Sequence, residues 1–171
     1  RLHSRSIPGI PDEKLQGLGD GAEAGVGLAC AELLMGNQGP PDGVKKFGIL
    51  GEALNLASRL EGLTKQFEGV LVTEPFVEHA RAHGIAVRRL GRIRTKGRVE
   101  PSTIYALGQP SEPGFSDQAV ERWTAWVDAL ESGAAPPAAE AGWSSDAETL
   151  LDWWREGLFE AEGRYWRLTS K

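Results

Sequence analysis

The sequence predicts an α/β fold, in which helices cover a mostly antiparallel sheet, followed by a Trp-rich helical extension. Two observations predict it. Between residues 25 and 107, short apolar segments of strand length surround one longer amphipathic segment. All six tryptophans follow residue 114. We therefore expect an irregular lead-in over 1–24, an α/β domain over 25–108 and an acidic extension over 115–171.

The elements of the α/β domain follow from local patterns. The segment 25–35 is almost unbroken apolar sequence, which predicts a buried central strand. The Gly/Pro-rich segment 36–43 predicts a turn, so the short strand that follows is expected to form a hairpin with the first. The expected order continues with the short strand 46–50, a helix over about 52–66, a strand over 69–73, a short helix over 74–81 and an antiparallel pair over 86–94 and 102–107.

The helix expected over about 52–66 carries a polar pair beside its apolar stripe. Asn55 and Arg59 are four residues apart, so they share one face of the helix. They lie about 100° of rotation from the apolar residues, which places them at the rim of the core. The stripe expected to face the core is Leu56, Leu60, Leu63 and Phe67.

The extension is expected to form two helices and a small hairpin. Ser116 and Asp117 predict the start of a helix that runs to about Glu131. Beyond a low-complexity segment over 133–142, the pair Ser145 and Asp146 is predicted to cap a second helix, and 158–168 a hairpin. The first helix should bury one face, made of Val120, Trp123, Val127 and Leu130.

Charge limits what the extension can bind. A helix followed by a hairpin resembles part of a winged-helix module, which would suggest DNA. However, residues 110–171 hold 5 Lys/Arg against 12 Asp/Glu, whereas residues 1–109 hold 14 against 12. An acidic surface repels a phosphate backbone, so we expect no nucleic-acid partner. We expect the tryptophans to form a small core, or a patch that docks on the first domain or on a second subunit.

Composition restricts the class of protein further. The chain has 25% charged residues and no apolar run near the roughly 20 residues of a membrane span, which indicates a soluble globular protein. Its one cysteine, Cys30, excludes an internal disulfide and fits a reducing, cytoplasmic compartment. Because the chain starts at Arg1 rather than Met, we interpret it as part of a longer protein that could be membrane-anchored elsewhere.

Four segments together resemble the C-terminal half of the catalytic domain of class III adenylate and guanylate cyclases. They are GVGLACAELLMGNQG, KFGILGEALNLASRLEGLTK, VLVTEPF and LGRIRTKGRVEPSTIYAL, and their order and spacing match over about residues 25–107. The helix with the N-L-A-S-R-L core is the most specific of them. The resemblance implies a partial α+β sandwich of the cyclase type, which converts ATP or GTP to a 3′,5′-cyclic nucleotide and pyrophosphate in intracellular signalling.

The resemblance also assigns roles to individual residues. It implies that Asn55 orients the ribose and that Arg59 stabilises the phosphate in the transition state, a task suited to a guanidinium with its fixed, charged donors. The turn at 95–98 matches a basic loop of the family, so Lys96 and then Arg98 are expected to contact the triphosphate. The position that reads the purine edge is Gly48, which has no side chain with which to choose ATP over GTP.

The chain shows no counterpart of the family's metal-binding half. In the family, two aspartates that hold Mg²⁺ or Mn²⁺ lie on strands N-terminal to this region. Asp20 lies only five residues before Gly25, much closer than the family spacing, so we do not assign it that role. We expect no metal ligand in this chain and no cyclase activity from the chain alone.

Catalytic domains of the family pair head to tail and share their sites. The expected partner is therefore a second copy or the missing N-terminal half of the domain, with a nucleoside triphosphate as substrate. The alternative is a degenerate cyclase-homology module that dimerises and regulates without catalysis. Gly48 favours that alternative, as do Ala29, Cys30 and Ala31 where relatives have His, Thr and Gly.

Overall fold

The structure is a computed structural model that describes residues 25–95, 99–133, 138–139 and 143–168. The lead-in over 1–24, including Asp20, lies outside the described residues. The described elements are β1 (Val26–Leu28), β2 (Leu34–Gln38), β3 (Lys46–Leu50), α2 (Glu52–Leu63), β4 (Val70–Thr73), the 3-10 turn η2 (Glu74–Phe76), α3 (Val77–Ala82), β5 (Ala86–Arg94), β6 (Ser102–Gly108), α4 (Asp117–Glu131), α5 (Ser144–Arg155), β7 (Phe159–Glu160) and β8 (Tyr165–Arg167).

The fold is a mixed α+β arrangement built on a six-stranded sheet with the order β1-β4-β6-β5-β8-β7. The pairs β4/β6, β5/β6 and β7/β8 are antiparallel, while β1/β4 and β5/β8 are parallel. The predicted antiparallel pair over 86–94 and 102–107 is confirmed as β5 and β6, with Val87 opposite Leu107. The last strands extend the sheet, because Ile93 of β5 lies opposite Trp166 of β8.

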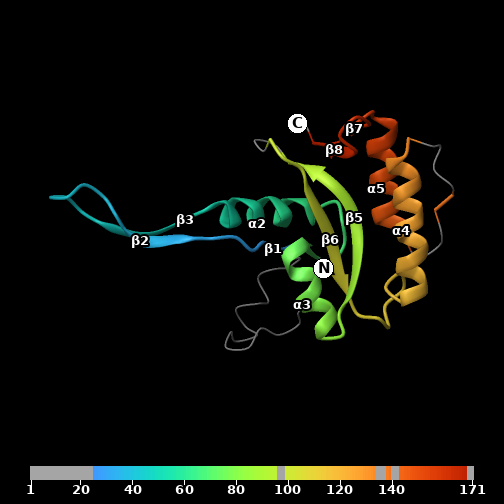
Figure 1. Cartoon of the computed structure of the whole chain (residues 1–171), viewed down its shortest axis with the longest axis horizontal. Helices are drawn as coiled ribbons and strands as arrows, with labels where there is room; N and C mark the ends of the chain where they lie inside the picture. Colours follow the sequence, from blue (N-terminus) through green and yellow to red (C-terminus); the bar gives the residue numbers. More distant parts are fainter. Residues whose placement is uncertain (1–24, 96–98, 134–137, 140–142, 169–171) are drawn as a thin grey trace, which may run out of the picture.

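Helices cover both faces of the sheet (Figure 1). The alternation of side chains along β6 separates two apolar clusters, with Ile104 and Ala106 on one face and Tyr105 and Leu107 on the other. The larger cluster contains most of the buried apolar residues of α2, α4 and α5, and the smaller one includes the buried residues of α3. The core therefore runs without interruption from the α/β region into the C-terminal helices.

The C-terminal segment forms the predicted elements. Ser116 caps α4, because its hydroxyl accepts a hydrogen bond from the Ala119 N–H at 3.3 Å. The predicted hairpin over 158–168 is confirmed as β7 and β8. Five tryptophans are buried in a core against the sheet and Trp154 is half-buried. The buried ones are Trp123, Trp126, Trp143, Trp153 and Trp166.

One predicted strand is wrong. The segment Gly25–Met35 does not form a single buried central strand, because β1 ends at Leu28 and β2 begins only at Leu34. β1 lies at the edge of the sheet and β2 pairs instead with β3, in the predicted hairpin. An apolar run has the same appearance in sequence whether its own chain covers it or leaves it exposed, and here most of it is exposed.

The hairpin of β2 and β3 projects from the sheet as an arm, which we define as residues 32–51 (Figure 1). A close turn joins the arm to α2. A Cβ added at Gly51 would lie 2.9 Å from the carbonyl oxygen of Glu32, so the turn allows the two sides of the arm to approach only because this residue is glycine. The arm therefore leads directly into the helix that carries Asn55 and Arg59.

Helix α2 lies directly on β1, and a second glycine allows that contact. A Cβ at Gly27 would lie 2.4 Å from both the Ala57 carbonyl oxygen and the Glu61 amide nitrogen. We expect Gly27→Ala to lower the free energy of unfolding by about 1–3 kcal/mol or more, since backbone atoms of α2 must move. Gly62→Ala is the matched control, because it meets no atom within 4 Å and should stabilise α2 by about 0.5–1 kcal/mol. Urea denaturation of both variants measures this, and equal effects would contradict it.

Candidate active site

The candidate active site is the exposed face of α2. The helix buries Ala53, Leu60 and Leu63 and so turns the opposite side outward. Asn55 is exposed and Arg59 is half-buried, which places both at the rim of the core as the sequence predicts. Leu56, expected in the buried stripe, is only partly buried, whereas the later residues of the stripe, including Phe67, are fully enclosed.

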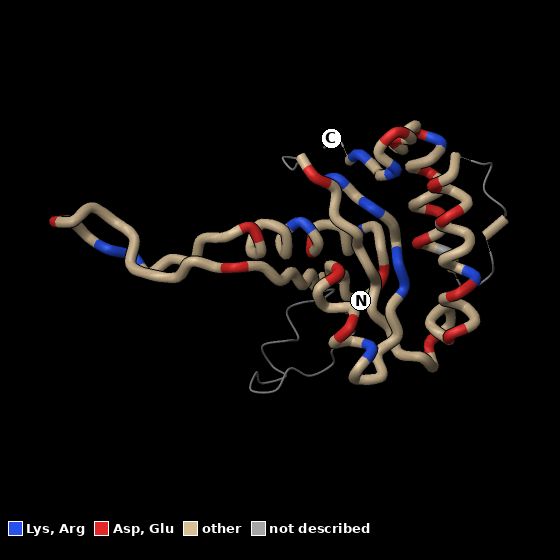
Figure 2. The backbone as a smooth tube through the Cα atoms, viewed as in Figure 1, with Lys and Arg blue, Asp and Glu red and all other residues tan. Residues whose placement is uncertain are grey.

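The surroundings of this face are acidic and apolar. Arg59 is the one basic residue within α2, and Glu52 and Glu61 are its acidic residues. Figure 2 shows these charges alternating along the helix, beside a second acidic position at the base of the arm. Leu54 stands next to Asn55 with 55% of its surface exposed. The face can therefore bind an anionic group through Arg59 and receive a hydrogen-bonding group at Asn55, next to an apolar contact.

Gly48 lies in the arm, away from the body of the domain. It pairs with Gly36 in the middle of the β2/β3 ladder. A Cβ at Gly48 would lie 2.7 Å from Nε2 of Gln38, at the end of a flexible side chain. The backbone does not require glycine at this position, so the fold would tolerate a side chain at residue 48. The absence of a side chain therefore affects only what the arm presents on its surface.

The basic loop cannot be placed against α2. Lys96 and Arg98 lie outside the described residues. The strand that leads to them is described as far as Thr95, and the guanidinium of Arg94 lies 4.7 Å from the ring centroid of Tyr165.

Among the described residues, no group of three or more His, Cys, Asp or Glu side chains is arranged to hold a metal ion. The described part of the chain also contains no helix that is both long and apolar enough to cross a membrane.

The sequence analysis did not predict a buried ion pair that lies beneath the C-terminal helices. Asp146 does not cap α5, which begins at Ser144 after Trp143; its Oδ2 instead accepts a hydrogen bond from Nη2 of Arg88. Its Oδ1 accepts one from the Glu68 N–H at 2.9 Å. Burial raises the pKa of Asp146 and lowers the pKa of Arg88, and the attraction between the two charges partly offsets both shifts. Two adjacent arginines within a buried strand were the signal available in the sequence.

The carboxylate of Glu131 accepts hydrogen bonds at a bulge in β5. The register of β5 shifts between Arg89 and Gly91, and the freed N–H of Arg92 donates to Oε1 of Glu131 at 3.2 Å. The other carboxylate oxygen of Glu131 accepts from Arg89 at 2.8 Å. Two acidic residues of α4, Asp128 and Glu131, therefore pair with Arg89 of the sheet, and this explains part of the negative charge of the extension.

Comparison with known proteins identifies a domain of the cyclase type in part of this chain. Over 86 residues, which are 48% of the chain, it is 32% identical to an adenylate cyclase of Anabaena cylindrica. This confirms the resemblance drawn from the sequence at the level of a cyclase-type domain. No family model matches the chain.

The chain is also similar to a solved structure, the adenylyl cyclase CyaB of P. aeruginosa. The similarity covers 57% of this chain and 49% of that one, with 26% sequence identity and a TM-score of 0.45. The match to the Anabaena enzyme covers 17% of its length. The chain therefore spans only a minor part of the curated relative that it matches.

Proposed function

We propose that this chain is the C-terminal part of a class III nucleotidyl cyclase domain and supplies one side of an active site shared between two subunits. The observation that supports it is the presence of Asn55 and Arg59 on one open face of α2, within a chain that is similar to an adenylate cyclase. The product is a 3′,5′-cyclic nucleotide made from ATP or GTP in the cytoplasm.

In the proposed reaction, the ribose 3′ oxygen attacks the α-phosphorus of the triphosphate. A bond forms between these two atoms, the bond from the α-phosphorus to the bridging oxygen breaks, and pyrophosphate leaves with that electron pair. The proton of the 3′ hydroxyl is released to solvent or to a base of the partner. Arg59 stabilises the negative charge that builds on the phosphate oxygens, and Asn55 holds the ribose in line. Lys96 and Arg98 are proposed to neutralise the triphosphate.

The described residues do not fit the Mg²⁺ or Mn²⁺ that such a reaction uses, since they include no cluster of metal ligands. We therefore propose that the metal ligands belong to the N-terminal half of the domain or to a second subunit. Gly48 offers no side chain to the purine, so the proposal leaves both ATP and GTP as substrates.

The isolated 171-residue chain is expected to make no cyclic nucleotide from ATP or GTP with either metal. A chimera tests the proposal directly: the matched 86 residues of the Anabaena cylindrica adenylate cyclase are replaced by the corresponding residues of this chain. The chimera should form cyclic nucleotide, measured by chromatography of the products. Turnover by the isolated chain, or a folded chimera without activity, would contradict the proposal.

A further inference from the structure

The turn that follows α2 is bonded to the C-terminal helix α5. The turn is formed by residues 66–68, which lie about 80 positions from α5 in the sequence. The Thr149 hydroxyl donates a hydrogen bond to the carbonyl oxygen of Gln66 at 3.0 Å. The N–H of Glu68 donates to Oδ1 of Asp146 at 2.9 Å. Both bonds use backbone atoms of the turn, so α5 fixes the path of the chain there.

An aromatic contact lies between these two hydrogen bonds. The ring of Phe67 meets the ring of Trp153 edge-on, with the two centroids 5.2 Å apart, and both side chains are buried. Asp146, Thr149 and Trp153 are separated by three and four residues, so they share one face of α5. One face of a single helix therefore contacts all three residues of the turn.

The turn is in turn bonded to the last residues of α2. The N–H groups of Gln66 and Phe67 both donate to the carbonyl oxygen of Leu63, at 2.9 and 3.0 Å. The N–H of Thr64 donates to the carbonyl oxygens of Leu60 and Glu61. A displacement of the turn therefore moves the C-terminal end of α2 with it.

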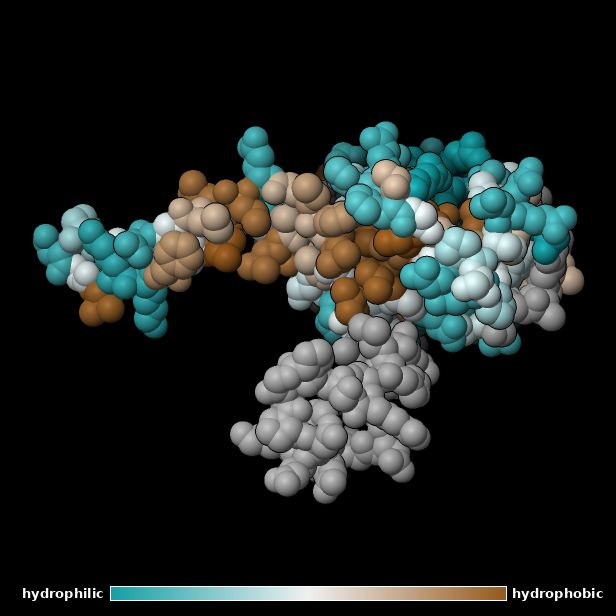
Figure 3. All heavy atoms as spheres, turned by 90° about the horizontal axis from the view of Figure 1, so that it is seen from below, coloured by the Kyte–Doolittle hydropathy of each residue, from teal (hydrophilic) through white to brown (hydrophobic). Residues whose placement is uncertain are grey.

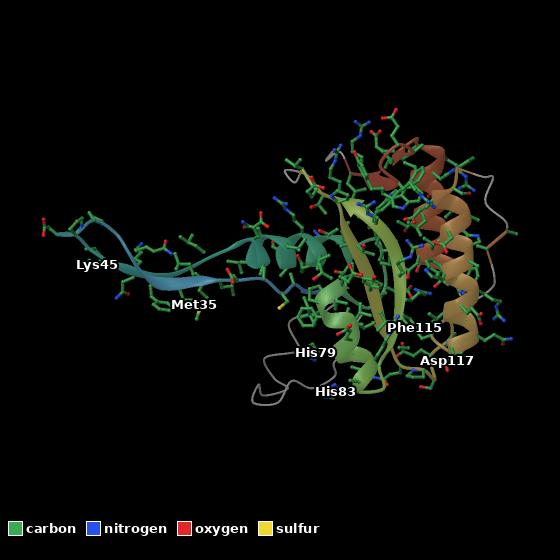
Figure 4. All side chains as sticks on the ribbon, in the orientation of Figure 1. Met35, Lys45, His79, His83, Phe115 and Asp117 are labelled. Atoms are coloured by element: carbon green, nitrogen blue, oxygen red, sulfur yellow. The ribbon has the colours of Figure 1, made fainter. Side chains whose placement is uncertain are left out.

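The other end of α2 is less enclosed. Of the three buried residues of the helix, Leu60 and Leu63 lie in its second half. Leu54 is 55% exposed, and Figure 3 shows exposed apolar side chains where the arm joins the body. In Figure 4 the arm, with Met35 and Lys45 labelled, projects beyond the start of α2, and no other element of the described chain lies beside it. The direction of α2 thus depends on how its second half is held.

A small change in that direction would displace the candidate site. Asn55 precedes Leu63 by eight residues, which corresponds to roughly 12 Å along the helix axis. A tilt of about 5° at Leu63 would therefore move Asn55 by about 1 Å. A misplacement of about 1 Å in an active site can lower a rate by about 100-fold. Precise restraint at the C-terminal end of α2 thus matters for the residues at its other end.

We propose that α5 is a positioning element for the candidate site, which sets the direction in which α2 presents Asn55 and Arg59. Thr149 is the positioning residue that shows this best, because burial of apolar surface does not require a hydroxyl bonded to a backbone carbonyl. The C-terminal extension is then part of the catalytic unit and not a separate module. The consequence for catalysis rests on the proposed function, whereas the restraint on α2 is independent of it.

Hydrogen exchange of the full 171-residue chain tests the restraint. Thr149→Val should speed exchange of the amides over 60–68 about fivefold, as expected for the loss of one hydrogen bond, and leave β5 and β6 unchanged. Thr149→Ser should restore the wild-type rates, because it keeps the hydroxyl. Thr124→Val is the matched control, since the Thr124 hydroxyl bonds the Val120 carbonyl oxygen within its own helix at 2.8 Å. Unchanged exchange over 60–68 in Thr149→Val, or the same increase there in Thr124→Val, would overturn the proposal.

Turnover tests the consequence for the site. In the chimera described above, extended to the end of this chain, Thr149→Val should lower kcat about three- to tenfold and leave KM within about twofold, because Arg59 acts mainly in the transition state. Thr149→Ser and Thr124→Val should keep kcat within about twofold. Faster exchange over 60–68 with unchanged kcat would overturn the positioning role. An inactive unsubstituted chimera would contradict the proposed function alone, since hydrogen exchange still decides whether α5 restrains α2.

Discussion

Arg59→Ala is expected to lower kcat of the chimera by about 100- to 1,000-fold, with a smaller change in KM, because the guanidinium acts mainly in the transition state. Arg59→Lys should recover only part of the activity, since an ammonium lacks the planar pair of donors. Lys65 is exposed and lies just beyond the end of α2, so Lys65→Ala should keep activity within about twofold of the unsubstituted chimera.

The same variant tests whether the site is shared between subunits. In a shared site, the Arg59→Ala chimera retains intact metal ligands on its own subunit. Mixing it with a chimera whose metal-binding aspartates are replaced should restore about a quarter of full activity, because half of the dimers then contain one complete site. No recovery in subunits that demonstrably exchange would contradict a shared site. Unchanged kcat in Arg59→Ala would contradict the role of this residue.

Patterns that depend on near neighbours predicted most of the fold. The reversal of the chain before β3, the helix with its stripe at Leu60 and Leu63, and the strand that became β4 all follow from periodicity and turn residues. The turn predicted over 36–43 is shorter than expected, because residues 36–38 belong to β2. The cap at Ser116 was equally local, because the bond it makes reaches only three residues along the chain. Such features depend on residues that are close together in the sequence.

Features that depend on distant partners could not be predicted in this way. The apolar run Gly25–Met35 predicts burial, yet only the fold reveals that β2 leaves the sheet. Asp146 near a helix start has the pattern of a cap, but Arg88, 58 residues away, determines what it binds. For the candidate site, the sequence placed Asn55 and Arg59 on one face of a helix, whereas the apolar arm beside them became apparent only with the exposed surfaces.

The ion pair between Arg88 and Asp146 connects the C-terminal helices to the sheet. The two side chains are 4% and 2% exposed. The guanidinium of Arg88 also lies 4.6 Å from the ring centroid of Phe115 and 4.4 Å from that of Trp123. Its Nε has no hydrogen-bond partner among the described residues. The charge of Arg88 is thus enclosed by aromatic rings and compensated mainly by one carboxylate.

Asp146→Ala is expected to lower the free energy of unfolding by about 3–5 kcal/mol, because it leaves the charge of Arg88 buried and unpaired. It also removes the acceptor of the Glu68 N–H. Asp152→Ala is the matched control within the same helix. Asp152 pairs with Arg155 at 2.7 Å, but both side chains are more than 60% exposed, so its loss should cost less than about 1 kcal/mol. Urea denaturation followed by tryptophan fluorescence measures both variants.

The double variant Arg88→Met/Asp146→Leu separates the cost of an unpaired charge from the cost of lost packing. Methionine and leucine fill similar volumes without charge, so this variant should be more stable than Asp146→Ala although it removes both members of the pair. If Asp146→Ala proved as mild as Asp152→Ala, the ion pair would not hold the C-terminal helices on the sheet. If the double variant were less stable than Asp146→Ala, the ion pair would contribute more stability than is needed to offset the cost of burying its two charges.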